Sequence, residues 1–171
     1  MALTESQELQ MRTPCPSFTL SSVDGKTYSL DDFKDSKALL VAFICSHCPY
    51  VQAIEDEFIA LSKAFPKENL QTIGICSNDA AKYPEDSPES LLKRWHAKNY
   101  EFPYLVDTTQ KVAQAFDAVC TPDLFLYNAD RQLYYHGRFQ DLKSAITDLV
   151  AGKEPPQDQK HSIGCSIKWF D

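Results

Sequence analysis

The sequence predicts a single α/β domain with a central mixed sheet flanked by helices, and three observations support this. The run from Ala38 to Ile44 is almost entirely apolar, as expected for a strand covered on both faces. Apolar residues then recur every three or four positions from Val51 to Phe65, which predicts an amphipathic helix. Residues 70–76 form a second core strand, so strand, helix and strand make a βαβ unit with parallel strands.

The N-terminal part of the chain predicts a β-hairpin. Two short alternating segments, 18–20 and 27–30, flank Asp24-Gly25, a dipeptide typical of hairpin turns. Residues 1–13 are expected to form a helical turn or a loose arm. The hairpin therefore precedes the core strand and adds to the sheet.

The second half of the chain alternates helices and strands and ends in a tail. Expected helices begin at Ser87-Pro88, follow Asp107, and follow Asp141, while expected strands cover residues 103–106, 124–127 and 133–136. The tail, residues 153–171, begins polar but carries four large apolar residues near its end. We expect it to fold back on a single domain that spans residues 1–171.

Composition and charge restrict the classes of partner. The 171 residues carry a net charge of −7, which argues against nucleic acid or an anionic membrane as a partner. No apolar run approaches the roughly 20 residues of a membrane span. The polar N-terminus has no apolar segment typical of a secretory signal, so a cytoplasmic location is expected.

The loop between the core strand and the first helix holds the main chemical candidates. Cys48 precedes Pro49, a residue suited to the first helical position, so its thiol is expected at a helix N-terminus. Outward-pointing N–H groups and the helix dipole favour the reactive thiolate there. His47 can stabilise that thiolate as imidazolium or shuttle a proton as imidazole, or it is simply a solvated loop residue.

Two other cysteines compete as the redox partner of Cys48. Cys45 lies three residues earlier, and a turn can bring the two Cα atoms into disulfide range. Cys165 lies in the apolar tail and can reach Cys48 if the tail docks near the helix start. Of the remaining cysteines, Cys15 and Cys76 have no evident role. The acidic pair Glu85-Asp86 is expected to be a solvated loop.

The chain resembles the thioredoxin-fold superfamily, in its AhpC/TSA or redoxin branch. The hairpin, the strand-to-helix cysteine, Thr121-Pro122 before a strand, and Gly137-Arg138 at a strand end follow that branch's order. Within it, the chain is similar to a peroxiredoxin-like subgroup with three motifs: C-x-H-C-P-Y-V, S-N-D with Y-P-E-D-S-P-E, and G-C-S-I-K-W. They stand here at residues 45–51, 77–89 and 164–169.

The resemblance implies roles for particular residues. Cys48, five residues after Phe43, takes the nucleophile position, and Val51 replaces the usual second cysteine. It also implies that Pro122 is cis and that its loop faces the nucleophile. Thr121, Pro122 and Cys120 are then expected to bind the extended substrate.

The sequence also departs from both relevant patterns. Ala42 replaces the buried carboxylate of thioredoxins. Val41 and Cys45 replace the proline and threonine of the peroxidase pattern. These departures leave the proton acceptor and the peroxidatic pocket of the related proteins without a counterpart at these positions.

The function that follows is thiol–disulfide exchange. Cys48 attacks a disulfide, and Cys165 or Cys45 resolves the mixed disulfide. The expected partners are a protein or small-molecule disulfide and a thiol electron donor, with no cofactor and no resident metal. One alternative is a peroxiredoxin-like, antioxidant thiol peroxidase. The other is a non-enzymatic metal-binding protein whose ligands come from a larger set: Cys45, His47, Cys48, Cys120 and Cys165.

Overall fold

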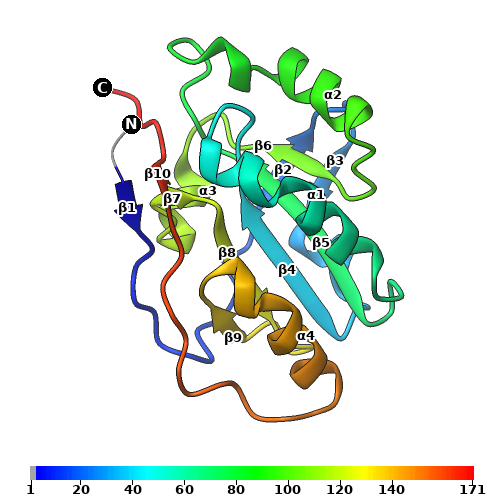
Figure 1. The fold of residues 1–171 in the computed structure, drawn as a ribbon. Coiled ribbons are helices and arrows are strands. Elements are labelled where there is room, and N and C mark those ends of the chain that lie inside the picture. Colours follow the sequence, from blue (N-terminus) through cyan, green and yellow to red (C-terminus); the bar gives the residue numbers. More distant parts are fainter. Residues whose placement is uncertain (1–2) are drawn as a thin grey trace.

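A seven-stranded mixed sheet forms the centre of the computed structural model, which describes residues 3–171 (Figure 1). The strand order is β3-β2-β6-β5-β4-β8-β9. Strand β4 pairs in parallel with β5 and antiparallel with β8, so the predicted mixed sheet is confirmed. The strands of this sheet are β2 (Thr19–Ser22), β3 (Thr27–Ser29), β4 (Ala38–Phe43), β5 (Leu70–Cys76), β6 (Tyr104–Val106), β8 (Asp123–Tyr127) and β9 (Leu133–His136).

The N-terminal hairpin is formed by β2 and β3, which pair antiparallel. Gly25 stands in its turn with φ +89°, a left-handed conformation that glycine adopts without steric cost. Strand β2 also pairs with β6, which joins the hairpin to the central sheet. The Asp24-Gly25 turn is therefore placed as the sequence predicts.

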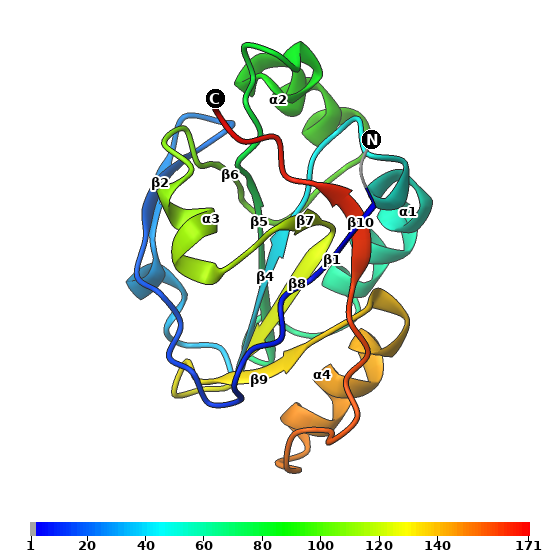
Figure 2. The ribbon, with the colours of Figure 1, turned by 90° about the vertical axis from the view of Figure 1, so that its left-hand side faces the viewer.

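Helices cover both faces of the sheet, with α1 and α4 on the face opposite α3 (Figure 2). This arrangement is the thioredoxin-like fold expected from the sequence. Among the described residues, no helix is both long and apolar enough to cross a membrane. The helices are α1 (Pro49–Lys63), α2 (Pro88–Ala97), α3 (Lys111–Phe116) and α4 (Leu142–Val150), with 3-10 turns η1 (Leu30–Phe33), η2 (Pro84–Asp86) and η3 (Phe139–Asp141).

Strand β4 lies at the centre of the core, and every one of its residues is buried. Leu40 and Ala42 belong to the apolar cluster beneath α1 and α4, while Leu39, Val41 and Phe43 belong to the cluster beneath α3. Successive side chains of a strand point to opposite faces, so a strand between two helical layers must be apolar throughout. This rigid strand delivers the cysteine loop to the end of the sheet.

A second, three-stranded sheet joins the two ends of the chain. Its order is β1-β10-β7, formed by β1 (Leu3–Glu5), β10 (Ile163–Ser166) and β7 (Cys120–Thr121). In Figure 1 the blue β1 runs beside the red tail strand β10. The expected helical turn or loose arm at residues 1–13 is thus wrong for Leu3–Glu5, because the pairing partner lies at the far end of the chain. Residues 1 and 2 lie outside the described part.

Candidate active site

The cysteine loop places Cys48 directly before α1, whose first residue is Pro49. The Cys48 side chain is fully buried. The Val51 amide in the first turn of the helix helps to lower the pKa of this thiol. A free N–H group at a helix start and the positive end of the helix dipole both stabilise a thiolate. The local sequence therefore creates the environment that thiol chemistry requires.

Cys165 on β10 lies directly against Cys48. The two Sγ atoms are 2.7 Å apart, and both cysteines are free. A disulfide bond is about 2.0 Å long, so a small movement of the two side chains suffices to form one. Both sulfurs thus lie at the start of α1.

Gly164 permits this approach. Strand β10 pairs with β7 so that Cys165 lies opposite Thr121. A Cβ atom on Gly164 would lie 2.0 Å from the Thr121 carbonyl oxygen. Because that oxygen belongs to the backbone, no side-chain rotation can relieve the clash. Only glycine at this position lets the tail strand lie close enough to bring Cys165 to Cys48.

The three thiols near the helix start differ in acidity. A hydrogen bond from the Cys45 thiol is the main reason that the pKa of Cys48 falls from 9.0 to about 4; the Cys165 thiol adds to this effect and burial opposes it. The same hydrogen bond, together with burial, raises the pKa of Cys45. Burial and the neighbouring Cys48 charge raise the pKa of Cys165 to about 11. Cys48 is therefore the most acidic of these three thiols, and Cys45 and Cys165 are the weaker acids.

His47 faces a buried carboxylate. Its Nδ1 lies 2.6 Å from Asp86 Oδ2, and its ring stacks on Tyr83 with 5.2 Å between ring centroids. The Asp86 side chain is fully buried and accepts hydrogen bonds from Ser46 and Asn78. The expectation of a solvated loop at Glu85-Asp86 is therefore wrong for Asp86, because donors from distant segments surround its carboxylate.

The loop at Pro122 faces the cysteines. The Thr121–Pro122 peptide is cis, and Thr121 Oγ1 lies 3.5 Å from Cys45 Sγ. Cys120 is buried, and burial raises its pKa. The backbone edge of β7, expected to hold an extended substrate, is paired with β10. An external peptide therefore cannot pair there while the tail strand is in place.

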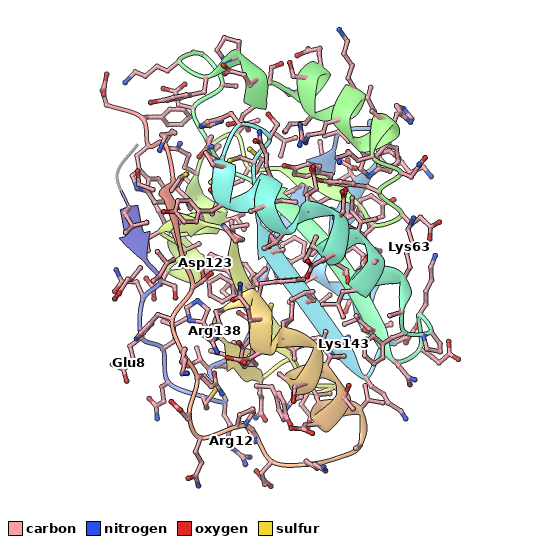
Figure 3. All side chains as sticks on the ribbon, in the orientation of Figure 1. Glu8, Arg12, Lys63, Asp123, Arg138 and Lys143 are labelled. Carbon is pink, nitrogen blue, oxygen red and sulfur yellow. The ribbon has the colours of Figure 1, made fainter. Side chains whose placement is uncertain are left out.

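A buried pair of an aspartate and a histidine lies behind this loop, and the sequence did not predict it. Asp123 Oδ1 lies 2.6 Å from His136 Nε2, and both side chains are almost completely buried (Asp123 is labelled in Figure 3). Burial raises the pKa of Asp123, although His136 opposes the shift. Asp123, a polar residue at the start of the buried strand β8, was the one signal in the sequence. His136 lies nine residues beyond the end of β8, and periodicity does not identify it as the partner.

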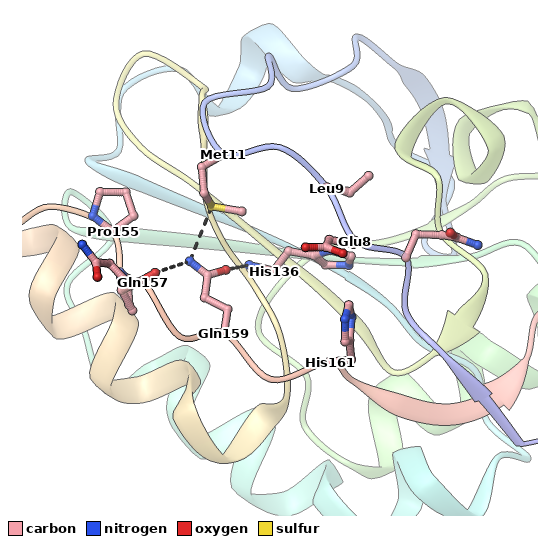
Figure 4. A pocket seen from close by; sticks show the side chains of 10 residues that line it. Glu8, Leu9, Met11, His136, Pro155, Gln157, Gln159 and His161 are labelled. Atoms are coloured by element: carbon pink, nitrogen blue, oxygen red, sulfur yellow. Dashed lines mark hydrogen bonds between the residues drawn. The ribbon is translucent and has the colours of Figure 1, made fainter.

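Two hollows lie beside the tail, and within residues 3–171 no cysteine lines either of them. One, of about 350 Å³, lies between the N-terminal arm and the tail, and it is lined by residues including Glu8, His136 and His161 (Figure 4). The other, of about 530 Å³, is lined by Tyr50, Pro122 and Ile163 among others. Ile163 and Cys165 lie two apart on β10 and so point to the same face of the strand. The second hollow is therefore beside the thiol pair.

One set of side chains has donor atoms that can hold a metal ion. Atoms of Cys45, His47 and Asp86 all lie within 4.8 Å of one another. Thiolate, imidazole and carboxylate are all ligands for zinc. Both Asp86 oxygens, however, already accept hydrogen bonds from Ser46 and Asn78. Across residues 3–171, Cys48, Cys120 and Cys165 join no such set, so the larger ligand set of the metal-binding alternative is not assembled.

Comparison with known proteins gives the family. Residues 11–136 match the AhpC/TSA family, and the chain belongs to it. The solved structure of an uncharacterized conserved protein from Geobacillus kaustophilus is 38% identical; the match covers 99% of this chain and 97% of that chain, with a TM-score of 0.96.

Two curated relatives are more distant. Thiol-disulfide oxidoreductase ResA from Bacillus thuringiensis is 20% identical over 147 residues, which is 86% of this chain and 80% of the relative. Chloroplastic peroxiredoxin Q from Triticum aestivum is 28% identical over 155 residues, which is 90% of this chain and 63% of the relative.

Proposed function

We propose that this protein is a thiol–disulfide oxidoreductase in which Cys48 is the nucleophile and Cys165 the resolving thiol. The observation that carries the proposal is the 2.7 Å approach of the two free sulfurs at the start of α1. The name of the ResA relative agrees with this class of reaction. The partners are a protein or small-molecule disulfide and a thiol that returns the enzyme to its reduced form.

The reaction proceeds in two exchanges. The Cys48 thiolate attacks one sulfur of the substrate disulfide, forms a mixed disulfide and releases the first substrate thiolate. Cys165 then attacks the Cys48 sulfur, and its proton ends on the second substrate thiol. The protein is left with a Cys48–Cys165 disulfide, and the substrate is fully reduced. Two thiols of the electron donor subsequently reduce the protein disulfide by the same chemistry.

The acidity of the two cysteines suits this order. In the free enzyme the Cys48 charge helps to keep Cys165 protonated, because it raises the pKa of Cys165. Once Cys48 is in a mixed disulfide, that charge is gone and Cys165 loses its proton more readily. The resolving thiol is thus activated only after the first exchange has occurred.

Substrate reaches the pair beside the tail strand. Cys48 is fully buried, whereas Tyr50 and Ile163 are 44% and 45% exposed and line the adjacent hollow. A substrate sulfur that enters between Tyr50 and Ile163 approaches the thiol pair along the face of β10. A small outward movement of β10 opens the path to Cys48.

Turnover of a small aromatic disulfide tests the proposal. The wild type is compared with Cys48→Ser, and Cys15→Ser serves as the control because Cys15 lies on the opposite side of the sheet. The Cys48→Ser protein should lose turnover, and Cys15→Ser should retain it. Equal turnover by Cys48→Ser and the wild type would refute the proposal.

A thiol peroxidase is the second candidate, favoured by the similarity to peroxiredoxin Q. A peroxide is small enough to reach a buried Cys48, where thiolate attack on an oxygen gives a sulfenic acid and water or an alcohol. Cys165 then condenses with the sulfenic acid and releases water. Peroxide consumption no faster than that of a free thiol would remove this candidate.

A further inference from the structure

We propose that Asp86 is a positioning residue that ties the docked tail to the cysteine loop. Its carboxylate holds the loop on one side and, through Asn78, the tail on the other. The inference rests on the proposed function, because it concerns how Cys48 and Cys165 are brought together. It also gives a role to the segment 77–89, which the redox reaction itself does not use.

The first half of the linkage is the contact with the cysteine loop. Asp86 Oδ1 accepts hydrogen bonds from the Ser46 amide at 2.8 Å and from the Ser46 hydroxyl at 3.0 Å. Asp86 Oδ2 lies 2.6 Å from His47 Nδ1. Ser46 and His47 are the two residues between Cys45 and Cys48. The carboxylate therefore fixes the part of the loop that positions the Cys45 and Cys48 thiols.

The second half of the linkage is the contact with the tail. The Asn78 side-chain amide donates to Asp86 Oδ2 at 2.9 Å, and its oxygen accepts from the Lys168 backbone N–H at 2.9 Å. Lys168 lies three residues after Cys165. One amide side chain thus connects the buried carboxylate to the tail just beyond the resolving thiol.

The charge of Asp86 fixes the orientation of this amide. A carboxylate accepts hydrogen bonds but donates none, so it requires the Asn78 nitrogen to face it. The Asn78 oxygen must then face the tail, where the Lys168 N–H needs an acceptor. An amide at position 86 could present its own NH₂ group and let Asn78 turn round. The tail would then lose its acceptor, although nothing in the tail itself had changed.

The three segments that this linkage connects lie far apart in the sequence, which makes the coupling specific. Residues 46–47, 78 and 168 come from the cysteine loop, the loop after β5 and the tail. Asp86 is fully buried, so these hydrogen bonds have little competition from water. Bonds to a charged group are also stronger than bonds between neutral groups.

The disulfide equilibrium of Asp86→Asn tests the coupling. The reduced protein is equilibrated with glutathione buffers, and the Cys48–Cys165 disulfide is quantified by mass spectrometry. A looser tail lowers the effective concentration of Cys165 at Cys48. We expect the equilibrium constant for disulfide formation to fall about tenfold, which corresponds to about 1.4 kcal/mol. Hydrogen exchange at the Lys168 amide should accelerate in parallel.

The neighbouring exposed acid provides the matched control. Glu85→Gln removes the same charge one residue away, and its equilibrium and exchange rate should equal those of the wild type. An Asp86→Asn protein that folds and shows unchanged values in both measurements overturns the proposal. Neither measurement involves turnover, so loss of the proposed activity in the wild type would leave this test intact.

Asn78→Ala keeps the proposal testable if Asp86→Asn does not fold. It removes the bridge to the tail but leaves the contacts of Asp86 with Ser46 and His47. Exchange at Lys168 should accelerate, while the thiolate titration of Cys48 should stay as in the wild type. Unchanged exchange at Lys168 would contradict the linkage. In the double variant, Asp86→Asn should add little to the effect of Asn78→Ala on the tail.

Discussion

The two segments that carry the redox cysteines are held in different ways. The cysteine loop continues a fully buried strand, β4, into a 15-residue helix, α1. The tail strand β10 has four residues and is held on its two sides by pairing with the short strands β1 and β7. Side chains from other loops, chiefly Asn78 and Gln110, fasten the residues that follow it.

The difference indicates a division of labour between the nucleophile and its partner. Cys48 is fixed by the core, because its loop is anchored by the buried strand β4 on one side and by α1 on the other. Cys165 is fixed by pairing with two short strands and by one close backbone approach, and such small sheets open at lower cost than a central core. A partner thiol that can withdraw allows the substrate to enter, and one that returns can resolve the mixed disulfide.

Removing the partner thiol should have the largest effect. Cys165→Ser leaves the mixed disulfide without its neighbouring thiol, and we expect turnover to fall about 100-fold or more, since an adjacent group reacts far faster than one in solution. Cys45→Ser should lose much less, because Cys45 only donates a hydrogen bond. Steady-state turnover of a small disulfide measures both. A larger loss in Cys45→Ser would reverse the assignment.

Displacing the tail strand should have the next largest effect. Gly164→Val places a Cβ atom against the Thr121 carbonyl, so β10 must move away from β7. We expect the unfolding free energy to fall by about 1–3 kcal/mol. Formation of the Cys48–Cys165 disulfide should slow at the same time. Leu3→Ala, at an exposed position of the paired strand β1, is the control for both measurements.

Loosening the end of the tail should have an effect of similar size on stability. Gln110 donates to the Lys168 carbonyl at 2.9 Å and to the Ser77 carbonyl at 2.7 Å, and it accepts from the Phe170 amide at 3.0 Å. Gln110→Ala should lower the unfolding free energy by about 1–3 kcal/mol, because it leaves buried groups without partners. Chemical denaturation measures this. Gln114→Ala, on an exposed face of α3, should be neutral.

The smallest expected effect is a shift in the pKa of Cys48 when Cys45 is replaced. The ultraviolet absorbance of the thiolate should titrate with a pKa of about 4 in the reduced wild type and disappear in Cys48→Ser. Cys45→Ala should move this transition to higher pH, because the main hydrogen bond to the thiolate is removed. A transition that stays near 9 in the wild type would contradict the assignment of Cys48 as the thiolate.

The same contrast explains what the sequence could predict. The cysteine loop follows from local patterns: an apolar strand, a proline at the first helical position and an amphipathic helix. The tail depends on contacts between residues far apart in the sequence, such as Cys48 and Cys165, which are separated by 117 positions. No local periodicity distinguishes Cys165 from Cys45 as the partner of Cys48, so the sequence alone leaves both cysteines as candidates.

The predictions that were wrong or missing also concern residues whose partners lie far away in the sequence. Leu3–Glu5 form a strand only because the tail supplies its neighbour. Asp86 is buried only because Ser46 and Asn78 surround it, and its acidic neighbour in the sequence suggested a solvated loop. The pairing of Asp123 with His136 likewise depends on the packing of β8 against β9. Burial of a polar residue is decided by distant partners, which composition and spacing do not reveal.

The disulfide map of the oxidised protein tests the central claim most directly. Mild oxidation followed by peptide mapping without reduction identifies which cysteines have joined. The 2.7 Å approach of the two sulfurs predicts a Cys48–Cys165 disulfide as the main product. A map dominated by Cys45–Cys48, or one in which Cys165 remains a free thiol, would contradict the assignment of the tail cysteine as the resolving thiol.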